Sequence, residues 1–113
     1  MHEMAIAEGI LDIVLKTAEQ HQAKKIVSIT LEIGQMTEVE PESLRFCFAA
    51  LSEETTAAGA VLEINHIPLV GRCRDCEKQF VIEKLRFLCP ACGSTGVEIL
   101  TGRELKVRHL EVE

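Results

Sequence analysis

The chain has few aromatic side chains, few prolines and no long apolar run. Its 113 residues include four Phe, three Pro, no Trp and no Tyr. The longest apolar run, Phe46 to Leu51, is far shorter than the ~20 residues that cross a bilayer, so we expect no membrane span. Hydrophobic residues still make up 47% of the chain, which excludes intrinsic disorder. A chain of this length can build one domain and at most a small second unit.

The chain also lacks an excess of positive charge. It carries 12 Lys and Arg against 18 Asp and Glu, for a formal net charge of −6. Phosphate backbones and anionic lipid surfaces repel such a chain, so we expect neither nucleic acid nor a membrane as partner. Glu3, Glu8 and Asp12 lie where a signal peptide needs positive charge and then apolar residues. The sequence therefore predicts a cytoplasmic protein.

The spacing of apolar residues predicts two helices and three strands. Helical periodicity covers 4–21 and 41–54, with Pro41 suited to the first turn of the second helix. Alternation of apolar and polar residues predicts strands at 25–33, 61–67 and 103–112. We therefore expect an α+β fold in which two helices cover one face of a three-stranded sheet.

The cysteines have the spacing of a metal site. Cys73 and Cys76 form one CxxC pair, Cys89 and Cys92 form another, and twelve residues separate the pairs. Two such pairs supply four thiolates in a tetrahedron around zinc and leave no position open for substrate. We predict structural Zn(II) in a zinc-ribbon-like, rubredoxin-like unit over 70–94, which has too few apolar residues to fold alone. This unit is inserted into an α+β domain made of 1–69 and 95–113.

Two other interpretations of the cysteines stay open. A thiol oxidoreductase would need one CxxC pair and leaves the second pair unexplained. The other is a zinc-ribbon module that binds proteins or nucleic acid and transfers no nickel. Nucleic-acid binding would need a basic surface, yet residues 71–94 carry no net charge once four thiolates and one Zn²⁺ are counted. The fifth cysteine, Cys47, lies on the apolar stripe of the second helix and is interpreted as a core residue.

The amino terminus offers a second, weaker metal site. The α-amine of Met1 and the amide and imidazole nitrogens of His2 can form fused chelate rings around one ion. A nitrogen-rich set of this kind favours square-planar Ni(II) or Cu(II), and Glu3 could complete it. The alternative is a solvated terminal histidine followed by a glutamate that stabilises the first helical turn. His66 or His109, each in a predicted strand, could add a further nitrogen.

Three motifs together resemble a known family over nearly the whole chain. They are Met1-His2-Glu3-Met4, the segment Val39-Glu40-Pro41-Glu42-Ser43-Leu44-Arg45-Phe46, and the four paired cysteines. The chain resembles the hydrogenase nickel-incorporation proteins of the HypA/HybF family.

That resemblance implies a nickel metallochaperone and not an enzyme. Its cargo would be Ni(II), held with His2 as the key ligand and with Met1 and Glu3 beside it. It would deliver nickel to the large-subunit precursor of [NiFe]-hydrogenase, working with the GTPase HypB. A homodimer is among the candidate assemblies.

Overall fold

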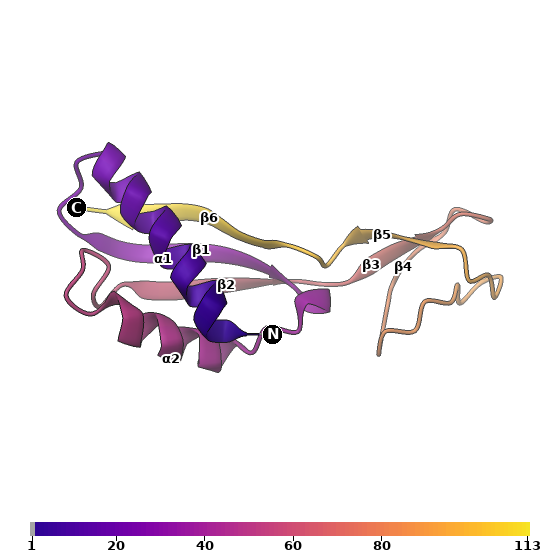
Figure 1. Cartoon of the computed structure of the whole chain (residues 1–113). Helices are drawn as coiled ribbons and strands as arrows, with labels where there is room; N and C mark the ends of the chain where they lie inside the picture. Colours follow the sequence, from indigo (N-terminus) through magenta and orange to yellow (C-terminus); the bar gives the residue numbers. More distant parts are fainter. Residues whose placement is uncertain (1) are drawn as a thin grey trace.

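The molecule is elongated and has two lobes (Figure 1). The computed structural model describes residues 2–113. Its extents are 54 × 25 × 16 Å and its radius of gyration is 17.5 Å, against about 13 Å for a compact domain of this length. Both helices lie in one lobe, and the four paired cysteines lie in the other.

A mixed three-stranded sheet forms the base of the helical lobe. Its order is β2-β1-β6, with β1 spanning Ile26–Gly34, β2 Val61–Ile67 and β6 Leu105–Val112. The central strand β1 is parallel to β2 and antiparallel to β6. Parallel neighbours need a crossover connection, which is the role of the second helix.

Two helices cover one face of this sheet and confirm the predicted α+β fold. They are α1 at Glu3–Gln20 and α2 at Pro41–Ser52. The carboxylate of Glu40 caps α2 by accepting hydrogen bonds from the backbone N–H groups of Glu42 and Ser43. Across residues 2–113, neither helix has the length and apolarity that crossing a bilayer requires.

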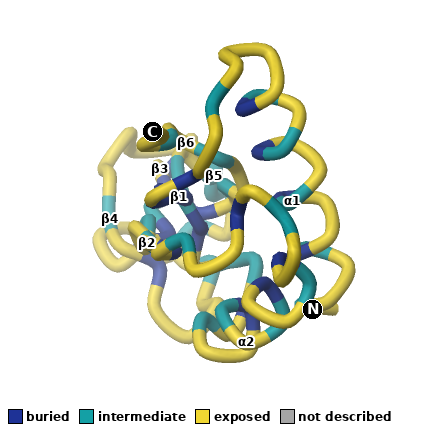
Figure 2. The backbone as a smooth tube through the Cα atoms, turned by 90° about the vertical axis from the view of Figure 1, so that its left-hand side faces the viewer, coloured by how far each residue is buried: buried dark blue, intermediate teal, exposed yellow. Residues whose placement is uncertain are grey.

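The hydrophobic core lies between the helices and the sheet, where buried segments of both meet in Figure 2. The opposite face of the sheet is polar. Its central strand presents buried Ser28 and Thr30 and the half-buried Glu32. The core comprises Ala7, Ile10, Val14, Ala18, Ile26, Ile29, Leu31, Ile33, Val39, Leu44, Phe48, Ala57 and Leu62.

The second lobe contains a sheet that we did not predict. Its order is β4-β3-β5, with β3 at Val70–Cys73, β4 at Gln79–Val81 and β5 at Val97–Thr101, all antiparallel. Strands of three to five residues leave too short a pattern in the sequence to detect. The predicted division assigns 95–113 to the helical domain. Within that range β6 pairs with β1, whereas β5 pairs with β3. The division into two domains stays a prediction.

The two lobes are joined where backbone packs directly on backbone. A Cβ atom added to Gly34 would lie 2.0 Å from the carbonyl oxygen of Gly102. Gly102 itself has φ 117° and packs against Leu69, which is 1% exposed. The backbone N–H of Met36 donates to the Gly102 carbonyl at 2.8 Å. Glycine at 34 and 102 therefore permits the close approach that connects the lobes.

Candidate metal centres

The four paired cysteines converge on one point in the second lobe. Their Sγ atoms all lie within 4.8 Å of one another, with Cys73 and Cys92 at 3.5 Å and Cys76 and Cys89 at 3.6 Å. Four sulfurs at ~2.3 Å from a tetrahedral zinc ion lie about 3.8 Å apart, close to these separations. A disulfide would need about 2.05 Å, so the pairs are thiols. The donor set fits a zinc ion.

Each CxxC pair is held by the same local turn. The backbone N–H of Glu77 donates to the carbonyl of Cys73, and that of Gly93 to the carbonyl of Cys89, both at 2.9 Å. Both residues that follow a pair have positive φ, 64° at Glu77 and 76° at Gly93. The two turns are therefore equivalent in form, although one uses glycine at the strained position and the other does not.

The thiols differ in acidity because they share a small volume. A hydrogen bond from the backbone N–H of Cys92 lowers the pKa of Cys89 to about 6. The N–H of Cys76 likewise lowers the pKa of Cys73. For Cys92, the N–H of Ser94 acts in the same direction, but contact with the Cys73 sulfur and burial raise its pKa to about 12. Some of the sulfurs therefore favour the thiolate and others the thiol, and a divalent cation would favour ionisation of all four.

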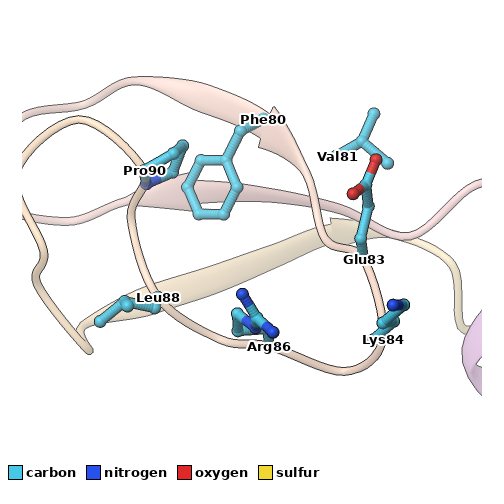
Figure 3. A pocket seen from close by; sticks show the side chains of 7 residues that line it. All are labelled: Phe80, Val81, Glu83, Lys84, Arg86, Leu88 and Pro90. Carbon is cyan, nitrogen blue, oxygen red and sulfur yellow. The ribbon is translucent and has the colours of Figure 1, made fainter.

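A hollow of about 230 Å³ lies on the same lobe but apart from the sulfurs. In Figure 3, the chain from Glu83 to Pro90 forms a ring, and the side chains of Phe80 and Arg86 point into it. Pro90 is the link to the cysteines, because it directly follows Cys89. No thiol and no histidine lines this hollow. It is a mixed apolar and charged surface, and the metal donors lie elsewhere.

The predicted nickel ligands lie at the start of α1. Met1 is outside the described residues. His2 is exposed, has extended backbone, and its side chain makes no capping hydrogen bond to α1. The carboxylate of Glu3 accepts a hydrogen bond from the backbone N–H of Glu40 at 3.2 Å, which lowers the pKa of Glu3. The structure thus brings the start of α1 beside the start of α2, a proximity that the sequence did not reveal.

The remaining candidates from the sequence fall in different places. His109 lies on the helix-free face of the sheet, 3.3 Å from the Thr30 hydroxyl, which separates it from the helix-covered face where α1 begins. His66 pairs with Ile33 and is exposed, and its role as a nickel ligand stays a prediction. Cys47 is half-buried and packs against the core, in line with its interpretation as a structural residue.

The chain is similar along its full length to hydrogenase maturation proteins. The family model described as "Hydrogenase/urease nickel incorporation, metallochaperone, hypA" matches residues 1–112. Hydrogenase maturation factor HypA of Desulfitobacterium hafniense is 41% identical over 113 residues, which cover 100% of this chain and 99% of that protein. The HypA of Geobacter sulfurreducens is 42% identical over 113 residues, 100% of both chains.

Solved structures show the same fold. The solution structure of the Ni metallochaperone HypA from Helicobacter pylori matches with a TM-score of 0.69 and 26% identity, over 99% of this chain and 97% of that one. A second solution structure, of HypA protein, matches with a TM-score of 0.74 and 26% identity, over 100% and 97%. With the family match and the four converging thiols, the chain belongs to the HypA family of nickel metallochaperones that act in hydrogenase maturation.

Proposed function

We propose that this chain captures one Ni(II) ion at its amino terminus and delivers it to the large-subunit precursor of [NiFe]-hydrogenase. The observation that carries the proposal is the exposed His2 at the start of α1, in a chain of this family. The ligands are the α-amine of Met1 and the amide and imidazole nitrogens of His2, with Glu3 beside them. The nickel is cargo, and the chain itself catalyses no reaction.

The nitrogen-rich set explains why nickel and zinc would stay apart on one chain. Two or three nitrogens in fused chelate rings favour square-planar Ni(II), whereas four thiolates in a tetrahedron favour Zn(II). We propose that Cys73, Cys76, Cys89 and Cys92 hold structural zinc. That site has no open coordination position, so it would fix the second lobe and take no part in nickel transfer.

Protons would compete with nickel for its ligands. The α-amine, the imidazole and an amide nitrogen must all lose protons before nickel binds. The Glu3 carboxylate stays ionised below its ordinary range, because the N–H of Glu40 lowers its pKa. Nickel affinity should therefore fall steeply as pH drops, while the contact between Glu3 and Glu40 persists.

The partners follow from the same proposal. Nickel would pass to the hydrogenase large-subunit precursor with the aid of the GTPase HypB, which would carry out any GTP hydrolysis. These steps belong in the cytoplasm. A homodimer is a further candidate assembly in this proposal.

A nickel titration of the untagged, zinc-loaded chain tests the proposal. We expect one nickel per chain, and for His2→Ala a loss of affinity of more than about a hundredfold. His21→Ala is the matched control, because His21 is an exposed histidine at the other end of α1. One residue added before Met1 should also abolish binding, since it displaces the α-amine. Equal nickel affinity in His2→Ala and His21→Ala would refute the proposed site.

A further inference from the structure

The hollow on the second lobe is bordered by β4, which is an edge strand. β4 pairs with β3 on one side, and no strand of the described residues pairs with its other side. The backbone N–H of Ile82 donates to the Leu69 carbonyl at 2.8 Å, so alternate residues along β4 bond toward β3. Gln79 and Val81, both exposed, therefore direct their backbone N–H and C=O groups to the open edge.

The walls of the hollow combine apolar side chains with two cations. Phe80 and Arg86 point into it, and Lys84 and Leu88 lie on the ring of chain around it (Figure 3). Val81 is 56% exposed and Leu88 44%, so apolar surface at the rim faces the solvent. The volume of about 230 Å³ is below the roughly 300–1,000 Å³ of pockets for drug-sized ligands. The hollow therefore suits one inserted side chain better than a cofactor.

Both cations of the hollow are free to bind an anion. Among the described residues, neither Arg86 nor Lys84 takes part in an ion pair. Glu83 is the one acidic side chain of the lining, and in Figure 3 it lies near Val81 and apart from the Arg86 guanidinium. A guanidinium binds a carboxylate through two parallel hydrogen bonds, and apolar surroundings strengthen that contact. The charge of the hollow thus complements an acidic ligand.

A strained turn holds one of these cations at the rim. The backbone N–H of Arg86 donates to the carbonyl of Glu83 at 3.0 Å, and the two central residues, Lys84 and Leu85, have φ of 52° and 55°. A turn of this form usually contains Asn and Gly, because other side chains are strained at positive φ. Here the strained positions hold an ammonium group and a leucine that is 50% exposed. Such strain clusters at functional segments, which favours a binding role for this turn.

We propose that this hollow binds an extended acidic segment of a partner protein. One apolar side chain of the segment would enter the hollow, and flanking carboxylates would bind Arg86 and Lys84. The segment would run beside β4 and use the backbone groups of its open edge. A single-stranded nucleic acid fits less well, because such strands need a basic groove and several stacking aromatics, and the lining has only Phe80. The segment would also contact Pro90, within the second CxxC pair.

A designed pentapeptide with blocked ends is the probe, with one leucine flanked by two glutamates on each side. We titrate it into the full, zinc-loaded chain and follow backbone amide shifts by NMR. It should bind with a dissociation constant of about 1 mM or below and shift the amides of Phe80, Arg86 and Leu88. A peptide with alanine in place of leucine should bind at least about tenfold more weakly. A peptide with lysines in place of the glutamates should lose binding to a similar extent.

Two variants of the chain locate the site. Arg86→Glu should weaken binding of the glutamate–leucine peptide at least about tenfold. Arg72→Glu is the matched control, because Arg72 is exposed in the same lobe and alternates with Gly71, which pairs with Phe80, so it lies on the other face of the sheet. The double variant Lys84→Asn, Leu85→Gly should relax the turn. It should unfold at higher denaturant concentration than the parent chain and still bind the peptide more weakly.

Several results would overturn the proposal. They are equal peptide affinity of the Arg86→Glu and Arg72→Glu chains, shifts confined to the helical lobe, and no shift at about 10 mM peptide. Equal binding of the alanine or lysine peptide would overturn it as well, and so would tighter binding of a five-nucleotide oligothymidylate. Nickel binding at His2 should be the same in all of these variants, so this test is independent of the proposed nickel function.

Discussion

The two lobes of the molecule are stabilised in different ways. The helical lobe has a continuous apolar core that both helices and all three strands of its sheet supply. The second lobe has far fewer buried side chains, namely Leu69, Ile82 and two of the thiols, Cys73 and Cys89. Its strands of three to five residues cannot bury enough apolar surface to offset the entropy of ordering the chain. Comparison of the lobes indicates that one folds by its core, and we propose that the other depends on a metal ion at its four thiols.

The two halves of the chain differ in charge as well. Residues 1–60 contain ten Asp and Glu against four Lys and Arg, whereas residues 61–113 contain eight of each. The whole excess of Asp and Glu over Lys and Arg therefore belongs to the half that carries His2, Glu3 and both helices. An acidic surface raises the local concentration of cations, which suits an end of the molecule that would capture Ni(II). The zinc-binding half would hold its ion by thiolate bonds and needs no such field.

The largest expected effect comes from removal of zinc, which should unfold the second lobe and leave the helical lobe folded. Structural zinc sites supply ~10–16 kcal/mol to folding, so a chelator or Cys73→Ser should unfold the second lobe. Amide hydrogen exchange should show loss of protection in β3, β4 and β5, while β1 stays protected. Cys47→Ser makes the same chemical change outside the thiol cluster and should leave the second lobe folded. Loss of protection in β1 to the same extent as in β3 would show that the lobes fold as one unit.

The sequence revealed the helical lobe better than the second one, for physical reasons. Helices of three or more turns and the alternating strand at Val61–Ile67 leave long periodic patterns, and both were predicted. The CxxC pairs revealed that four thiols would converge, because that spacing has few other uses. Long-range contacts left no such pattern. The hydrogen bond from the Glu40 N–H to Glu3 joins residues 37 positions apart.

A second expected effect tests the junction between the lobes. Gly34→Ala places a methyl group 2.0 Å from the carbonyl oxygen of Gly102, where backbone and not a flexible side chain must move. We expect a loss of about 3 kcal/mol or more in the free energy of unfolding, measured by denaturant titration. Gly9→Ala is the matched control, because a Cβ there meets nothing within 4 Å in the middle of α1. That variant should be more stable by up to ~1 kcal/mol. Similar free energies of unfolding of the two variants would mean that the backbone at the junction shifts at little cost.

The smallest expected effect distinguishes the two cysteine turns from each other. Glu77 holds positive φ with a side chain, whereas Gly93 holds the equivalent position without one. Glu77→Gly should therefore stabilise the second lobe by roughly 0.5 kcal/mol, because relief of backbone strain exceeds the entropy that glycine adds to the unfolded chain. Gly93→Ala should destabilise it by about 1 kcal/mol. Competition with a chelator measures the zinc affinity of each variant. We expect that affinity to follow both changes in the stability of the second lobe. Equal effects of the same sign would show that the turns are not equivalent, and that one of them has a second role in holding the metal.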